Sequence, residues 1–176
     1  MRFIPKIFIS SLSGLILMAL LFSCKKQVEY PIIPAIDFKR IEGVKDANGK
    51  DQSIKVTIGF TDGDGDIGYY SVESGKNDHQ FDFPADNTNP YYNNFKVKTY
   101  RKVNGIWTID PVDISARIPY LTPEGSNKAL KGEIERDLPV RPGLVRDTFY
   151  YEIFIWDRGL HASNTVTTSQ IILTTQ

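Results

Sequence analysis

Apolar and polar residues alternate along most of the chain after residue 34, with the period of two that is typical of β-strands. Within residues 53–60, isoleucine, valine and phenylalanine side chains fall on one face and smaller or polar ones on the other. Residues 130–138 alternate in the same way and carry charged residues on the second face. These segments are predicted to be half-buried strands of antiparallel sheets.

Other segments add further strands. Residues 148–156 are apolar on both faces, which favours a central strand. A shorter alternation covers residues 114–118. Asn-Gly at 48–49 predicts a hairpin between a strand near residues 36–41 and the 53–60 strand, and Asn-Gly at 104–105 joins residues 95–102 with 106–109. About seven to nine strands predict an all-β, antiparallel, immunoglobulin-like β-sandwich over residues 35–176.

The N-terminus differs in character from the rest of the chain. Arg2 and Lys6 precede an uncharged, apolar run over residues 7–22. This order is typical of a secretory signal peptide, predicted here over residues 1–23. The run is short for a bilayer core, which needs about 20 residues, so a permanent membrane helix is the second interpretation.

The apolar run ends in Leu21, Phe22, Ser23 and Cys24, which resembles the lipobox of bacterial lipoproteins, although Phe22 stands where a small residue is usual. The resemblance implies cleavage before Cys24 and lipid on its thiol. Cys24 is the only cysteine, so the exported domain can form no internal disulfide. The alternative is an incidental thiol beside an uncleaved anchor. Residues 24–34 are predicted to be the lipidated cysteine and a short tether.

Charge gives no support for nucleic-acid binding. The 21 basic residues, less Arg2 and Lys6 in the signal peptide, leave 19 against 21 acidic ones, a net charge near −2. The partner expected from the N-terminus is a membrane, reached through the lipid. Lysines follow Cys24 where no aspartate occurs, which resembles lipoproteins sorted to the outer membrane, on either its periplasmic or its surface face.

An acidic loop, defined here as residues 62–68, follows the 53–60 strand directly. Asp62, Asp64 and Asp66 alternate with glycines, which lets several carboxylate oxygens turn toward one centre. Calcium takes about six to eight oxygen ligands, so the loop predicts a calcium site. The alternative is an Asp-Gly turn without metal. The spacing also matches part of an EF-hand, with Glu73 at the twelfth place, but Ile67 replaces its glycine and the flanks are strand-like.

Two motifs together resemble a family of small lipoproteins of diderm bacteria, with one immunoglobulin-like domain. The first is the Phe-Thr-Asp-Gly-Asp-Gly-Asp-Ile-Gly run of residues 60–68. The second is the Asp-Arg-Gly-Leu-His-Ala-Ser-Asn turn of residues 157–164, one residue shorter than in some relatives, followed by a Thr/Val-rich strand. The resemblance does not cover residues 69–147. It implies fold and location, whereas a fold does not fix a function.

In an immunoglobulin-like sandwich, the loops after the second and sixth strands open at the same end. We therefore expect Asp157 to lie beside the acidic loop as a further calcium ligand. Lesser candidates are Asn164 and the backbone carbonyls of Ile67 or Gly68. The alternative role for Asp157 is a salt bridge with Arg158 or a turn-forming contact.

A long connection between residues 69 and 94 carries aromatic and polar side chains. Tyr69, Tyr70, His79, Tyr91 and Tyr92 are the candidate ligand surface, for a glycan or a protein partner. The same residues also occur in ordinary polar loops.

These features predict a lipid-anchored envelope lipoprotein whose calcium-stabilised sandwich serves as a binding or scaffolding module. The alternative is a secreted hydrolase acting on glycans or peptides. The chain offers only His79 and His161 and contains no Gly-x-Ser-x-Gly motif, so no catalytic residue is assigned and an enzyme is not expected.

Overall fold

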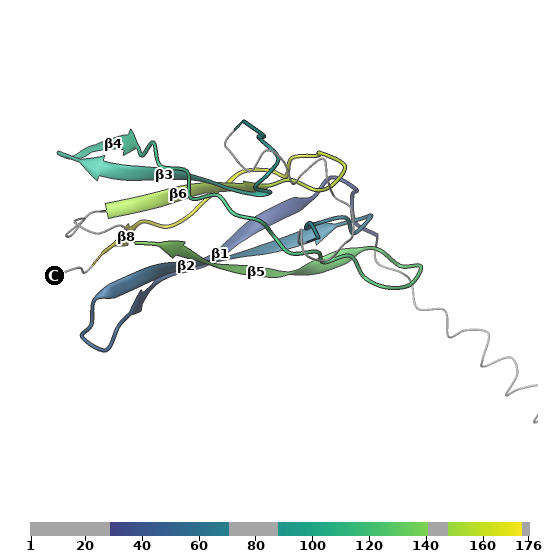
Figure 1. Ribbon diagram of the computed structural model, residues 1–176, viewed down its shortest axis with the longest axis horizontal. Coiled ribbons are helices and arrows are strands. Elements are labelled where there is room, and N and C mark those ends of the chain that lie inside the picture. Colours follow the sequence, from purple (N-terminus) through teal and green to yellow (C-terminus); the bar gives the residue numbers. More distant parts are fainter. Residues whose placement is uncertain (1–28, 71–87, 141–147, 174–176) are drawn as a thin grey trace, which may run out of the picture.

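The structure is a computed structural model that describes residues 29–70, 88–140 and 148–173. These residues form strands in two antiparallel sheets that lie in two layers (Figure 1). The strands are β1 (Ala35–Lys45), β2 (Asp51–Asp62), β3 (Phe95–Val103), β4 (Ile106–Ile109), β5 (Leu130–Pro139), β6 (Thr148–Ile155), β7 (Val166–Thr167) and β8 (Ile171–Ile172). The predicted all-β, sandwich-like architecture is confirmed. The proposed signal peptide, Cys24, Glu73 and His79 lie outside the described residues.

The first sheet has the order β1-β2-β5, with β2 between its two neighbours. Ile54 pairs with Leu138 and Ile58 with Ile134, so the apolar faces of β2 and β5 point the same way. Ile54 and Ile58 are almost fully buried, as the alternation predicted. The inner face of this sheet therefore supplies one half of the hydrophobic core.

The second sheet has the order β4-β3-β6-β7, and β8 also pairs with β6. Alternate residues of β6 face the core, where Ile153 and Ile155 are fully buried. Tyr150 and Phe154 face the other way and are half-buried. The prediction that this strand is central is confirmed.

The Asn-Gly turns are in place. Asn104 and Gly105 adopt φ of 51° and 83°, the left-handed conformations that a tight hairpin between β3 and β4 requires. Gly49 has a φ of 79° in the connection between β1 and β2, where the carboxylate of Asp46 accepts hydrogen bonds from two backbone N–H groups. Both predicted hairpins are confirmed.

The predicted strand at residues 114–118 is wrong in detail. This segment makes a single antiparallel bridge, Ala116 with Phe95, and is no continuous strand. The hydroxyl of Ser115 accepts the hydrogen bond of the Val97 N–H at 3.0 Å, in place of a backbone carbonyl. A side chain that substitutes for the backbone ladder ends regular pairing here.

Side-chain hydroxyls also take the place of backbone acceptors beside β6, and this shortens the last strand of the chain. Ser163 Oγ accepts from the N–H of Ile155, and Thr168 Oγ1 accepts from the N–H of Tyr151, both at 3.0 Å. The Thr168 hydroxyl satisfies the edge of β6 between its short pairings with β7 and β8, and the Ser163 hydroxyl does so beyond the pairing with β7. The Thr/Val-rich segment therefore covers β6 without forming one long strand.

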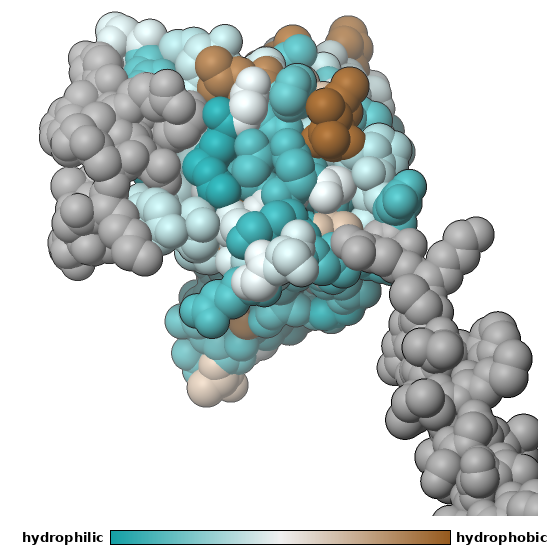
Figure 2. Space-filling model, turned by 90° about the vertical axis from the view of Figure 1, so that its right-hand side faces the viewer, coloured by the Kyte–Doolittle hydropathy of each residue, from teal (hydrophilic) through white to brown (hydrophobic). Residues whose placement is uncertain are grey.

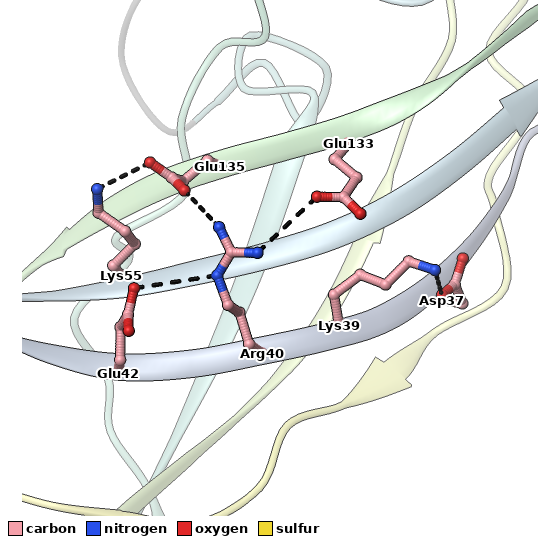
Figure 3. A network of polar contacts seen from close by, with 7 residues as sticks. All are labelled: Asp37, Lys39, Arg40, Glu42, Lys55, Glu133 and Glu135. Carbon is pink, nitrogen blue, oxygen red and sulfur yellow. Dashed lines mark hydrogen bonds and ion pairs between the residues drawn. The ribbon is translucent and has the colours of Figure 1, made fainter.

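Charged side chains from all three strands meet on the outer face of the first sheet (Figure 3). Arg40 of β1 lies 2.8 Å from Glu135 and 3.9 Å from both Glu133 and Glu42. Lys55 of β2 lies 2.8 Å from the second oxygen of Glu135. These groups are largely exposed, so solvent screens them and they add more to solubility than to stability.

The burial of β6 can be tested with matched isoleucine substitutions. Ile153→Ala removes a side chain that is 0% exposed and is expected to lower the free energy of unfolding by about 2–5 kcal/mol, because it leaves a cavity. Ile106→Ala, at a position 70% exposed, should change it by no more than about 0.5 kcal/mol. Urea denaturation measures both, and equal losses would contradict the orientation of β6.

Candidate metal centre

The acidic loop leaves β2 in a conformation that depends on glycine. Gly65 and Gly68 have φ of +67° and +87°, which side-chain-bearing residues rarely adopt. A Cβ at Gly65 would overlap the carbonyl oxygen of Lys128, and one at Gly68 would overlap that of Pro119. The loop is therefore packed backbone to backbone against residues 119–128.

A third glycine brings the loop against the start of the described chain. A Cβ at Gly63 would overlap the backbone of Tyr30 and Pro31. The segment that precedes β1 thus lies directly on the acidic loop, at the end of the sandwich where β2 and β6 finish.

The loop after β6 reaches the same place. Ile67 and Asp157 form an antiparallel bridge, and the N–H of Arg158 donates to the carbonyl of Asp66 at 3.2 Å. One carboxylate oxygen from each of Asp62, Asp66 and Asp157 lies within 4.8 Å of the other two. The predicted approach of Asp157 to the acidic loop is confirmed.

Hydrogen bonding satisfies only part of this carboxylate cluster, defined as Asp62, Asp66 and Asp157. Asp62 Oδ2 accepts from the N–H of Asp66, and Asp66 Oδ2 accepts from the N–H of Gly159, both at 2.9 Å. The Oδ1 atoms of Asp62 and Asp66 are buried and have no hydrogen-bond partner. Asp62 is 0% exposed, so its free oxygen is cut off from bulk water as well. Unsatisfied buried oxygens of this kind are what a bound cation would coordinate.

The carboxylates also repel one another. Burial, followed by the charge of Asp64, raises the pKa of Asp62 to about 7. Burial and the charge of Asp157 raise the pKa of Asp66 as well. Each group has lost water and faces further negative charge. A cation among these oxygens would offset both penalties, so the residues present fit a metal ion.

Asp157 is held by its own turn. Its Oδ1 accepts from the His161 N–H at 2.7 Å, and its Oδ2 lies 2.9 Å from His161 Nδ1. This contact raises the pKa of His161, because the carboxylate stabilises the imidazolium. The turn-forming role that was the alternative for Asp157 therefore exists together with its place in the cluster.

Arg158 joins the loops from the outside. Its guanidinium donates to the Gly68 carbonyl at 2.8 Å and to Thr122 Oγ1 at 2.6 Å, and it lies 4.6 Å from the Tyr120 ring centre. Thr122 in turn donates to the Gly65 carbonyl at 2.5 Å. The guanidinium thus serves this bracing and not the predicted alternative of a salt bridge to Asp157. Spacing in the sequence gave no signal for this role.

The remaining predicted ligands are placed differently. Asp64 is exposed and lies outside the carboxylate cluster, although its charge acts on it, so its role as a ligand stays a prediction. Asn164 exchanges two hydrogen bonds of 2.8 Å with the backbone of Ile36 and so fastens β1. The carbonyls of Ile67 and Gly68 accept from the Leu121 N–H and from Arg158. These contacts place the three lesser candidates in the fold, and their role as metal ligands stays a prediction.

The candidate tyrosine surface is largely packed away. Tyr69 is only 2% exposed, and the Arg117 guanidinium lies 4.9 Å from its ring centre and 5.0 Å from that of Tyr92. Tyr70 stacks on Tyr120 with ring centres 3.8 Å apart. Tyr69 cannot line an accessible surface, because its strand-like position after the loop turns it inward.

Tyr91 is half-buried, with its ring edge-on to Trp156 at 5.2 Å between centres. His79 lies outside the described residues. Apart from the buried Tyr69, the candidate ligand surface therefore stays a prediction.

In comparisons with known proteins, no family model, no curated protein and no solved structure matches the chain. Among the described residues, no helix has the length and apolar character needed to cross a membrane. The end of the sandwich around the acidic loop is mostly hydrophilic at its surface, with separate hydrophobic patches (Figure 2).

The packing of the acidic loop can be tested with two glycines that share a positive φ. Gly65→Ala and Gly125→Ala both strain the backbone by about 1–3 kcal/mol, but only the first also meets backbone atoms, since nothing lies within 4 Å of a Cβ at Gly125. Gly65→Ala is expected to lower the free energy of unfolding clearly more than Gly125→Ala. Chemical denaturation measures the difference, and equal effects would show that the loop is not packed as described.

Proposed function

We propose that the chain is a calcium-stabilised, lipid-anchored module of the bacterial cell envelope that serves in binding or scaffolding. The observation that carries the proposal is the pair of buried, unsatisfied oxygens on Asp62 and Asp66, two residues that form a carboxylate cluster with Asp157. A site built between two loops at the end of a sandwich is suited to hold those loops together.

Calcium is the cation that the ligand set favours. The cluster offers oxygen atoms only, and hard divalent cations prefer carboxylate and carbonyl oxygens. Magnesium keeps several of its waters and demands a strict octahedron, whereas calcium accepts irregular arrangements of protein oxygens. When bound, the ion would supply positive charge that links the loop after β2 to the turn after β6.

The strand order supports the finer proposal of an immunoglobulin-like domain. Constant-type domains place the first, second, fourth and fifth strands in one sheet and the third, sixth and seventh in the other, and the fourth strand is the one that differs here. The first sheet here is β1-β2-β5, and the second contains β3, β6 and β7. β4 extends the second sheet beyond β3, at the place where variable-type domains add a strand.

The proposed anchor follows from the sequence. Cys24 resembles a lipidation site, and three acyl chains would make attachment effectively permanent, since one chain binds membranes only marginally. The outer membrane is the proposed location, because Lys25 and Lys26 directly follow Cys24 and no aspartate stands there.

Calcium binding can be measured on the full-length protein in detergent. Calorimetric titration should detect binding, and calcium at about 100 times its dissociation constant should stabilise the fold by about 2.7 kcal/mol. Asp62→Asn keeps the size of the side chain, removes a ligand charge and is expected to abolish both effects. Since it also relieves repulsion, this variant should be at least as stable as the wild type in EDTA.

Two further variants serve as references. Asp37→Asn changes an exposed carboxylate whose ion pair is with Lys39, so calcium binding should persist. Asp64→Asn tests the predicted ligand outside the cluster, and its loss of affinity should be smaller than that of Asp62→Asn. Identical melting temperatures of the wild type in calcium and in EDTA would refute the metal site.

The anchor has an independent test. Cells fed an alkynyl fatty acid should label the wild-type protein, and Cys24→Ala should abolish labelling because the only thiol is gone. Immunoblotting of the same samples controls for expression. Equal labelling of the two proteins would rule out lipid on Cys24.

A further inference from the structure

The outer face of the second sheet carries an unusual number of aromatic rings for a surface turned away from the core. Tyr100 of β3 stacks on Tyr150 of β6 with ring centres 4.6 Å apart, and Trp107 of β4 meets Tyr150 edge-on at 4.7 Å. Phe154 and Trp156, 5.7 Å apart, form a second group on the same face, with Glu152 between the two groups. All five are half-buried. The exposed face of an antiparallel sheet is normally polar, so these rings call for a functional explanation.

A groove of about 480 Å³ lies on this face. Its floor includes Lys96, Lys98, Glu152 and Phe154, which project from β3 and β6. One wall is the chain at residues 109–113, which leaves the sheet after β4 and returns at Ala116 to pair with Phe95. The segment 109–113 therefore makes one side of a groove on the sheet face, and the groove has the size that small ligands occupy.

Polar groups of both kinds line the groove. Lys96 Nζ lies 4.0 Å from Asp113 Oδ2, and the Tyr100 hydroxyl donates to Glu152 Oε2 at 2.9 Å. Asp110 and Lys98 also contribute to the lining. Ammonium donors and carboxylate acceptors thus stand beside one aromatic ring, that of Phe154, and the two signs of charge are closely balanced. A strongly anionic ligand such as a nucleic acid finds no excess of positive charge here.

We infer that this groove binds a neutral glycan chain. A sugar ring has an apolar C–H face that packs on an aromatic ring, and hydroxyls at its rim that both donate and accept hydrogen bonds. Phe154 offers the ring, Glu152 and Asp113 accept hydrogen bonds, and Lys98 donates them. The inference rests on the proposed role as a binding module, and it does not depend on calcium or on the tyrosines near the acidic loop.

A peptide fits this place less well. Extended peptides gain affinity by adding a strand to a free sheet edge, through backbone hydrogen bonds. The groove lies over the sheet face, where the backbone groups of β3 and β6 already pair with each other. The edge of β3 beside the groove pairs with β4 from Tyr100 onward and with Ala116 at Phe95. Between these pairings, the Val97 N–H donates to Ser115 Oγ and the Thr99 carbonyl accepts from the Asp110 N–H, so this edge is partly occupied as well. A ligand in the groove must therefore be recognised through side chains.

The test uses the full-length protein in detergent on a microarray of neutral polysaccharides: β-glucan, xylan, α-glucan and mannan. At least one should bind, with its affinity then measured by calorimetry. Phe154→Ala should weaken binding by about tenfold or more, since it removes the stacking ring. Phe154→Leu keeps apolar packing without a ring and should lose nearly as much. Glu152→Gln should also weaken binding while retaining an acceptor for Tyr100.

Glu42→Gln, on the outer face of the other sheet, is the matched control and should bind like the wild type. Melting temperatures of all variants verify folding, and Phe154→Leu and Glu152→Gln remain informative should Phe154→Ala fail to fold. Absence of binding to every polysaccharide, or binding unchanged by both Phe154→Leu and Glu152→Gln, would overturn the inference. Calcium binding and lipid labelling, measured on the same wild-type protein, show separately whether the proposed function stands.

Discussion

The arrangement of one end of the sandwich depends on bringing three carboxylates together away from water. Asp62, Asp66 and Asp157 come from loops far apart in sequence, and each added charge makes the next harder to bury. The surroundings counter this cost with fixed N–H donors from Asp66, Gly159 and His161. These donors leave one oxygen of Asp62 and one of Asp66 without a partner, so the protein alone does not offset the full cost of burying the carboxylates.

Other residues at the carboxylate end of the sandwich also help to hold the two acidic segments together. Glycines let the loop lie against neighbouring backbone, because any side chain there would overlap the backbone of the adjoining segments. Arg158 spans the two loops with hydrogen bonds to a carbonyl and a hydroxyl, and so braces them whether or not a cation is present. The far end, by contrast, is closed by ordinary hairpins and apolar packing.

Much of this could be predicted from alternation and turn chemistry. The strands β2 and β5 alternate with a period of two, β6 is apolar on both faces, and strand direction alone brings Asp157 to the acidic loop. Alternation failed at residues 114–118, because the Ser115 hydroxyl replaces a backbone acceptor and no hydrophobicity pattern encodes that. The inward turn of Tyr69 depends on Arg117, 117 − 69 = 48 positions away along the chain, and the bracing by Arg158 depends on Thr122, 36 positions away. The groove on the second sheet was missed because outward aromatics were interpreted only as evidence of a central strand.

The contact of Tyr30 and Pro31 with Gly63 has a geometric consequence for a lipidated protein. Between Cys24 and Tyr30 there is so little chain that even a fully extended backbone reaches only about 20 Å. With acyl chains on Cys24, the carboxylate end of the sandwich would stay close to the bilayer, within the ionic atmosphere of the headgroups. The β3–β4 hairpin, at the opposite end (Figure 1), would then lie farthest from the membrane, with the long axis of the domain pointing away from the membrane surface.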